Sequence, residues 1–149
     1  MSGHQNDAAQ NFASGSHYEF SIPADVNGIA VIEDQVLQRV GAVGYDGDEC
    51  FAIGTAFREA LANAIVHGCK GDASKIVDGT VDCASDGNVC IVVRDPGPGF
   101  DPDKVPDPLH EDNLTSDHGR GVYLIRQLMD EVKFSNGGRE VQMKKFRHT

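Results

Sequence analysis

The sequence has no long apolar run and few basic residues, and both shortages limit what the protein can be. No stretch approaches the roughly 18 apolar residues that a membrane-spanning helix requires. Residues 1–16 lack the basic and then apolar pattern of a secretory signal. The 13 basic and 23 acidic residues give a net charge of −10, which disfavours non-specific binding to nucleic acid. We therefore expect a cytoplasmic protein with no direct membrane or nucleic-acid partner.

Cysteines are few, and their spacing is uninformative about metals. None of the four forms a C-x-x-C pair, which argues against a zinc site. In a cytoplasmic setting we expect them to be reduced. A two-residue hairpin turn at Asp86-Gly87 would place Cys83 opposite Cys90 across neighbouring strands.

The hydrophobic pattern predicts a single domain over residues 16–149, after a flexible leader in residues 1–15 that is rich in small and polar residues. Apolar residues at helical spacing predict helices over about 25–43, about 46–67, and from 122 to about 129. The predicted strands cover about residues 18–22, 76–84, 88–94, 131–135 and 139–146. This order predicts a two-layer α/β (α+β) sandwich, with a mostly antiparallel sheet covered by helices on one face.

The segment from residue 95 to residue 118 holds five of the six prolines and fits no regular element. A connection of this length without regular structure is typical of a lid or a binding loop. Ligand chemistry is therefore to be sought on either side of it.

Glu59, Asn63 and His67 recur every four residues, which places them along one stripe of the second predicted helix. The amide oxygen of Asn63 is a hard ligand suited to Mg²⁺, and the alanines around it would allow a nucleotide to approach. The alternative is the ordinary solvated face of an amphipathic helix. Taken alone, this stripe decides nothing.

Asp95 follows an apolar strand and precedes Gly97 and Gly99. A carboxylate held at a strand end can accept a hydrogen bond from an exocyclic amine, and the glycines permit close approach of a ligand. An ordinary Pro/Gly turn after a strand would have the same sequence. Both interpretations stay open at this point.

Gly119, Arg120 and Gly121 lead directly into the third predicted helix. Glycines at a helix N-terminus expose backbone N–H groups, and the helix dipole there favours an anion. A lone G-x-G also marks many simple tight turns.

Together, these three segments resemble the family of anti-sigma-factor serine-protein kinases. These are small members of the ATPase superfamily that includes sensor histidine kinases, type II topoisomerases and mismatch-repair ATPases. The E-x-x-x-N-A-x-x-H-G block at 59–68, D-x-G-x-G at 95–99 and G-x-G at 119–121 match the three boxes of that family in order. The likeness covers about residues 18–146 and implies a histidine-kinase-like ATPase fold.

The resemblance implies ATP and Mg²⁺ as cofactors and a role for each matched residue. Glu59 would be the general base, Asn63 would coordinate Mg²⁺, and Asp95 would bind the adenine amine. Gly97 and Gly99 would shape the adenine end of the pocket, while Gly119, Arg120 and Gly121 would cradle the phosphates. For His67, a structural role at the helix end and a place in the phosphate pocket remain alternatives.

The resemblance also implies partners: a sigma factor that the domain sequesters, and a STAS-type anti-anti-sigma protein that it phosphorylates on serine or threonine, with the domain as a homodimer. Two other functions remain open, a noncatalytic ATP-binding regulatory module and the detached catalytic domain of a histidine kinase. We do not expect a complete sensor histidine kinase, because 149 residues leave no room for a separate helical domain carrying a phosphoacceptor histidine.

Overall fold

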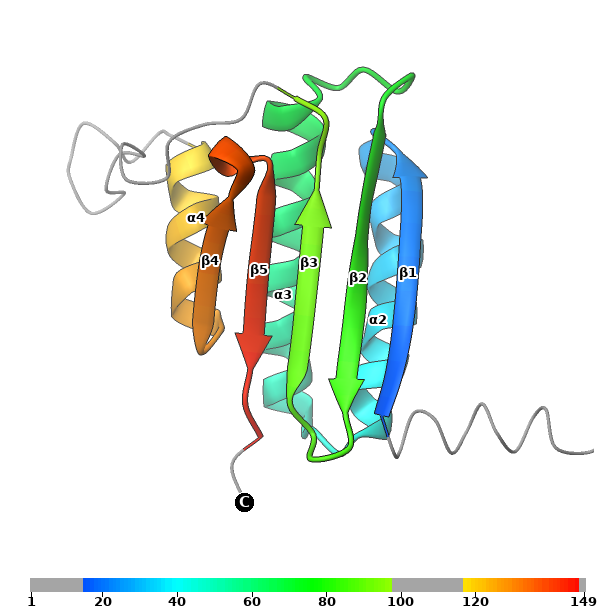
Figure 1. The fold of residues 1–149 in the computed structure, drawn as a ribbon, viewed down its shortest axis with the longest axis vertical. Helices are drawn as coiled ribbons and strands as arrows, with labels where there is room; N and C mark the ends of the chain where they lie inside the picture. The colour runs from blue at the N-terminus through cyan, green and yellow to red at the C-terminus, as the bar shows by residue number, and fades with distance from the viewer. Residues whose placement is uncertain (1–14, 98–116, 148–149) are drawn as a thin grey trace, which may run out of the picture.

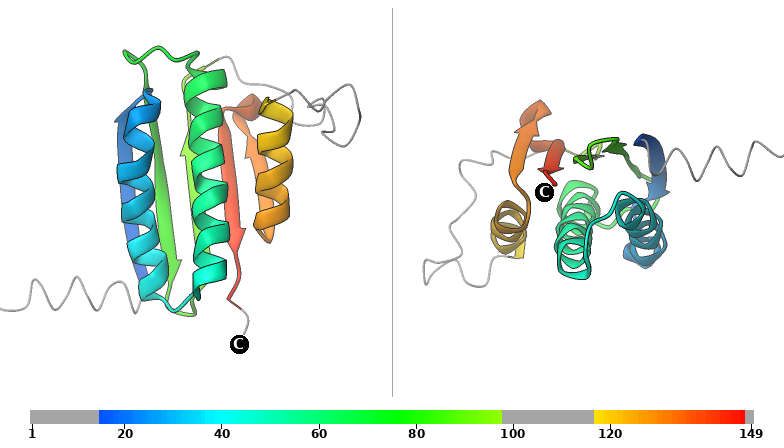
Figure 2. Two further views of the ribbon diagram at one scale, coloured as in Figure 1. Left: turned by 180° about the vertical axis from the view of Figure 1, so that it is seen from behind. Right: turned by 90° about the horizontal axis from the view of Figure 1, so that it is seen from below.

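The computed structural model describes residues 15–97 and 117–147, except for the side chains of residues 117–120. They form a five-stranded antiparallel sheet in the order β1-β2-β3-β5-β4, with three helices on one face (Figures 1 and 2). The strands are β1 (Gly15–Pro23), β2 (Ile76–Ala84), β3 (Val89–Arg94), β4 (Glu131–Ser135) and β5 (Glu140–Lys145). The helical elements are η1 (Val26–Gly28), α2 (Ile29–Ala42), α3 (Gly47–Ala62), η2 (Asn63–Gly68), α4 (Asp117–Leu128) and η5 (Asn136–Gly138). The predicted two-layer α/β fold is confirmed.

The core lies between the sheet and the three helices because β2, β3 and β5 alternate buried and more exposed residues. Helix α3 supplies the largest buried side chains at the centre, among them Phe57, whose ring meets that of Phe20 edge-on at 5.5 Å between centroids. Each fully buried side chain of this size contributes about 1.5–3 kcal/mol. This packing fixes α3 against the strands that form one side of the site.

Among the described residues, no helix covers the opposite face of the sheet (Figure 2). Most side chains on that face are polar or charged. Arg94 pairs across strands with Asp78 at 2.8 Å and with Glu140 at 3.7 Å on this face. An antiparallel sheet with one packed and one solvated face gives this alternation of apolar and polar residues.

Most of the predicted helix ends are confirmed, but the end of the second helix differs. Gly44, at a φ of +100°, follows α2, and the Asp46 carboxylate accepts a hydrogen bond from the Glu49 N–H at 2.8 Å to cap α3. The chain then winds as a π-helix from Asn63 to Gly68, rather than continuing as an α-helix to His67. A π-turn changes the angular step between residues, so the predicted stripe is altered after Asn63.

The β2–β3 hairpin also differs from the expected one. The Ala84 N–H donates to the Asn88 C=O at 2.8 Å, so the loop contains three residues and ends at Gly87, whose φ is +95°. The additional loop residue shifts the register by one. Cys83 is therefore buried under the helices while Cys90 lies on the open face, and the expected opposition of these two cysteines is wrong.

Helix α4 begins at Asp117, so Gly119–Gly121 lie within its first turns and not before it. The predicted leader in residues 1–15 and the predicted lid fall almost wholly on residues 1–14 and 98–116, which lie outside the described residues. In the described part of the chain, no helix has both the length and the apolar character needed to cross a membrane.

Candidate functional site

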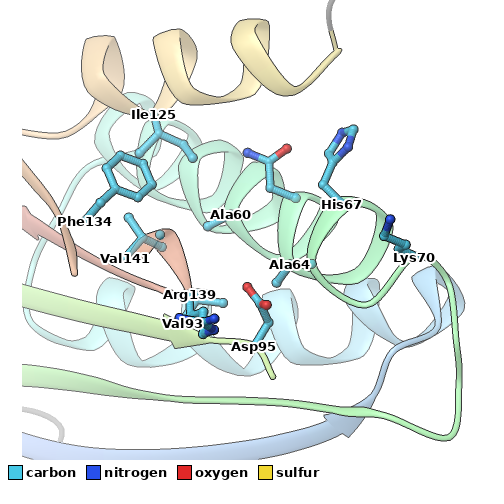
Figure 3. A pocket seen from close by; sticks show the side chains of 13 residues that line it. Ala60, Ala64, His67, Lys70, Val93, Asp95, Ile125, Phe134, Arg139 and Val141 are labelled. Carbon is cyan, nitrogen blue, oxygen red and sulfur yellow. The ribbon is translucent and has the colours of Figure 1, made fainter. Parts of the chain in front are cut away.

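A cavity of about 290 Å³ lies between the helices and the sheet, beside the end of β3 (Figure 3). Its walls come from α3 and η2 on one side, from β3, β5 and η5 on the other, and from α4 and β4 at the end of the cavity. The polar residues that line it are Asn63, His67, Lys70, Asp95 and Arg139. Its apolar walls include Ala60, Ala64, Val93, Ile125, Phe134 and Val141. Apolar walls with a few converging polar groups are typical of a small-molecule site.

Asp95 is held in place by the residues around it. Its backbone N–H donates to the Arg139 C=O at 2.9 Å, and its Oδ1 accepts from the Gly97 N–H at 2.8 Å. Burial raises the pKa of Asp95, while the Gly97 N–H and the Arg139 guanidinium act in the opposite direction. Figure 3 shows its carboxyl group turned toward the helix that carries Ala64. The site therefore holds a partly desolvated acceptor in a fixed orientation.

Two glycines allow Asp95 to pack against the end of η2, which continues from α3. A methyl group at Gly68 would overlap the Asp95 carboxyl group, and one at Gly97 would overlap the Gly68 C=O. Only glycine permits such close approach of backbone and side chain at both positions. The last residue of the first sequence segment is thus in direct contact with the second segment.

The third segment contacts the first at Asn63. A methyl group added at Gly121 would lie 2.9 Å from Asn63 Nδ2 and 3.0 Å from its Oδ1, so the side-chain amide occupies the space that this glycine leaves open. The Asn63 N–H donates to the carbonyls of Glu59 and Ala60 at the junction of α3 and η2. Glu59 therefore lies one helical turn before Asn63, and it is not among the residues that line the cavity.

The structure thus brings together Asn63, His67 and Asp95 at one cavity, with Gly97 and Gly121 packed against them. Gly99 lies outside the described residues. The backbone of Gly119 and Arg120 lies in the first turn of α4, and the Arg120 side chain is not among those that the structure describes.

Sequence reasoning missed two cationic residues of the cavity, Lys70 and Arg139. Lys70 follows the first segment by two residues and adopts a left-handed φ of 55°, which no pattern in the sequence signals. Arg139 follows the Asn136–Gly138 turn between β4 and β5, and it reaches Asp95 only because β3 pairs with β5.

The chain is similar to known proteins over most of its length. Residues 22–145 match the family described as the histidine kinase-like ATPase domain. Serine-protein kinase RsbW of Bacillus subtilis (strain 168) is 29% identical over 140 residues, which are 89% of this chain and 87% of its own length. The anti-sigma F factor of Geobacillus stearothermophilus is 32% identical over 134 residues, which are 87% of this chain and 90% of its own length.

A solved structure shares the fold: that of the RsbU and RsbW domains of Rv1364c from Mycobacterium tuberculosis. It superimposes with a TM-score of 0.57 at 19% identity and covers 89% of this chain, which spans only 35% of the solved one. At that identity the likeness supports the fold alone. The match over residues 22–145 and the relatives of about 30% identity show that the chain belongs to the histidine kinase-like ATPase domain family and, within it, to the family of anti-sigma-factor serine-protein kinases.

Proposed function

We propose that this chain is an Mg²⁺- and ATP-dependent serine/threonine-protein kinase that acts as an anti-sigma factor. The observation that carries the proposal is the packing of all three sequence segments around one cavity, through the Gly68–Asp95 and Gly121–Asn63 contacts. The printed names of its relatives, serine-protein kinase and anti-sigma F factor, support both parts of this function.

The end of the cavity near Asp95 fits an adenine base. A carboxylate with one oxygen bonded to Gly97 can accept from an exocyclic amine with the other, while Val93 and Val141 offer apolar walls to a flat ring. Gly97 shapes this end, and we assign the same role to Gly99.

The end near Asn63 fits the phosphates and their metal ion. Mg²⁺ is usually held by few protein oxygens together with phosphate oxygens, and the Asn63 amide oxygen suits this role. The bound metal would neutralise charge on the phosphates. His67 and Lys70 line the same cavity, and we assign Gly119, Arg120 and Gly121 at the start of α4 to phosphate binding.

Glu59 is the group that we assign as general base. It lies one turn before Asn63 on the same helix and outside the lining of the cavity. It is partly exposed, so a protein substrate can approach it from solvent. In phosphoryl transfer the protein mainly positions the reactants, and a carboxylate accepts the proton of the incoming hydroxyl.

The substrate that we propose is a serine or threonine of a STAS-type anti-anti-sigma protein, and the sequestered partner is a sigma factor. We further propose that the domain works as a homodimer in the cytoplasm, where ATP and sigma factors are found. ATP would then decide which of the two partners the domain holds.

The test is transfer of label from γ-labelled ATP into a soluble extract of the source cells, with wild type and Glu59→Gln compared. We expect one small labelled protein, stable to acid and absent with Glu59→Gln, while both forms bind ATP with affinities within about threefold, because Glu59 lies outside the cavity.

Three other outcomes would contradict the proposal. Acid-labile label would indicate transfer to histidine. Confirmed ATP binding without label would indicate a noncatalytic switch. Normal transfer by Glu59→Gln would show that another group is the base.

A further inference from the structure

Arg139 lies where the Asp95 end of the cavity meets the turn between β4 and β5, and none of the three sequence segments contains it. Arg94 pairs with Glu140 in the β3–β5 ladder, so Asp95 and Arg139 face each other at the next position along the two strands. Figure 3 shows the Arg139 side chain beside Val93 and Asp95. Pairing of β3 with β5 therefore places Arg139 next to the turn that contains Asp95.

Three hydrogen bonds form a closed ring through this turn. The Asp95 N–H donates to the Arg139 C=O at 2.9 Å, and the Gly97 N–H donates to Asp95 Oδ1 at 2.8 Å. The Arg139 Nε–H then donates to the Gly97 C=O at 2.7 Å. Only this last bond depends on the arginine side chain, and its length is that of a charge-assisted hydrogen bond.

The guanidinium group is itself held in place. Its Nη1 donates to the Asn136 C=O at 3.0 Å, so two carbonyls fix the plane of the group. A planar fork fixed at two points gives a directed donor, which a lysine ammonium does not provide. The ring therefore commits one Asp95 oxygen to Gly97 and leaves the other for a ligand.

The charge on Arg139 acts on the same carboxyl group. Burial raises the pKa of Asp95, and the Arg139 guanidinium opposes that rise. An ionised carboxylate is only an acceptor, whereas a protonated one can also donate. A 6-aminopurine presents a donor at C6 and a 6-oxopurine presents an acceptor, so the ionised form distinguishes between them.

We propose that Arg139 is a positioning residue that holds Asp95 as an acceptor and so sets the preference of the cavity for a 6-aminopurine nucleotide over a 6-oxopurine one. The inference rests on the proposed function in one respect, that Asp95 contacts the base.

The experiment measures Kd for ATP and for inosine triphosphate, which differ at C6, using the full chain. Wild type should bind ATP at least about tenfold more tightly. Arg139→Gln should weaken ATP binding about tenfold and change inosine triphosphate binding less than about twofold, so that the preference is lost. Arg139→Lys keeps the charge without the fork, and its preference should fall between the other two.

Arg94→Gln is the matched control. It removes the same charge one residue before Asp95, but from the open face of the sheet, where Arg94 pairs with Asp78. We expect the wild-type preference in this variant.

The outcomes separate the two proposals. If Arg139 has only a structural role, Arg139→Gln would weaken the binding of both nucleotides by the same factor. Such a result, which leaves the preference unchanged, would overturn this inference but not the proposed function. If Arg139→Gln does not fold, wild-type preference in Arg139→Lys overturns it. Wild-type protein that binds neither nucleotide, or both equally, would instead overturn the proposed function at Asp95 and this inference with it.

Discussion

At the scale of single residues, the geometry of the cavity depends on glycines as much as on charged groups. Gly68 admits the Asp95 carboxyl group and Gly121 admits the Asn63 amide. In both cases, a polar side chain occupies the space that a Cβ methyl group would fill. Substitutions at these positions therefore act on the ligand through another residue.

We predict that Gly121→Ala separates stability from nucleotide binding. Alanine is favoured over glycine in a helix interior by about 0.8–1 kcal/mol, so the free energy of unfolding should stay constant or rise. The new methyl group would displace the end of the Asn63 side chain, which should weaken Mg²⁺-dependent ATP binding at least about tenfold. Urea unfolding and ATP titrations, with Mg²⁺ and with a chelator, measure the two effects.

Gly41→Ala is the matched control, because Gly41 lies in α2 and a methyl group there meets no atom within 4 Å. It should retain wild-type ATP affinity. Equal ATP affinities for Gly121→Ala and Gly41→Ala would show that ATP binding does not depend on the position of the Asn63 side chain.

We predict a loss of stability at high pH that depends on Tyr45. Its hydroxyl donates to the Lys145 C=O at 3.0 Å, and burial raises the pKa of Tyr45 from its ordinary value of 10 to about 12. Above pH 10 the unfolded chain releases this proton while the folded chain keeps it, which favours unfolding. The contribution is complete below pH 10 and is lost toward pH 12, by about 1.4 kcal/mol per pH unit.

Urea unfolding of wild type and Tyr45→Phe at pH 9, 10 and 11 tests this. The variant lacks the titrating group, so its free energy of unfolding should fall less between pH 10 and pH 11. Parallel curves for the two proteins would disprove the linkage.

At the scale of elements, the fold could be predicted because each strand and helix carries its own periodicity. The local sequence also indicates a helix end at Gly44 and a cap at Asp46 or Asp48, and in the structure Gly44 is left-handed and Asp46 forms the cap. The π-turn from Asn63 was not, because one turn with wider hydrogen bonding leaves no distinct pattern of apolar residues.

Two further features depended on non-local pairing. Asp86-Gly87 fits hairpin loops of two or three residues, and the register of the β2–β3 pair decides which one forms. Arg139 meets Asp95 only across the β3–β5 pair, between residues far apart in the sequence. The motif residues could therefore be predicted as a candidate site, whereas Arg139, which helps to hold Asp95 in place, could not.

We predict that the first turn of α3 depends on Asp46. Its carboxylate accepts from the Glu49 N–H at 2.8 Å, and loss of such a cap costs about 1 kcal/mol. Asp46→Ala should lower the midpoint of urea unfolding with an unchanged slope, and Asp46→Asn should retain most of the stability. A loss as large in Asp46→Asn would mean that charge, and not capping, is responsible.

At the scale of the whole molecule, the cavity joins parts of the chain that are far apart in the sequence. Its walls come from both layers, through α3, η2 and α4 on one side and β3, β5 and η5 on the other. The protein as a whole is strongly acidic, with a net charge of −10, so phosphates must be bound by local groups against an unfavourable overall field. A ligand in this cavity binds only the folded chain.

We therefore predict that Mg²⁺ and ATP together raise the stability of the entire domain. At an ATP concentration of about 100 times Kd, mass action adds about 2.7 kcal/mol, which for a chain of this size raises Tm by roughly 10 °C. Asp95→Asn should lose most of this shift, because Gly97 would retain the amide oxygen and the amide donors would face the amine of adenine. Asp78→Asn removes the same charge from the open face and should keep the shift. Thermal unfolding with and without ligand decides the question: an equal shift in Asp95→Asn would mean that the ligand stabilises the molecule from somewhere other than this cavity.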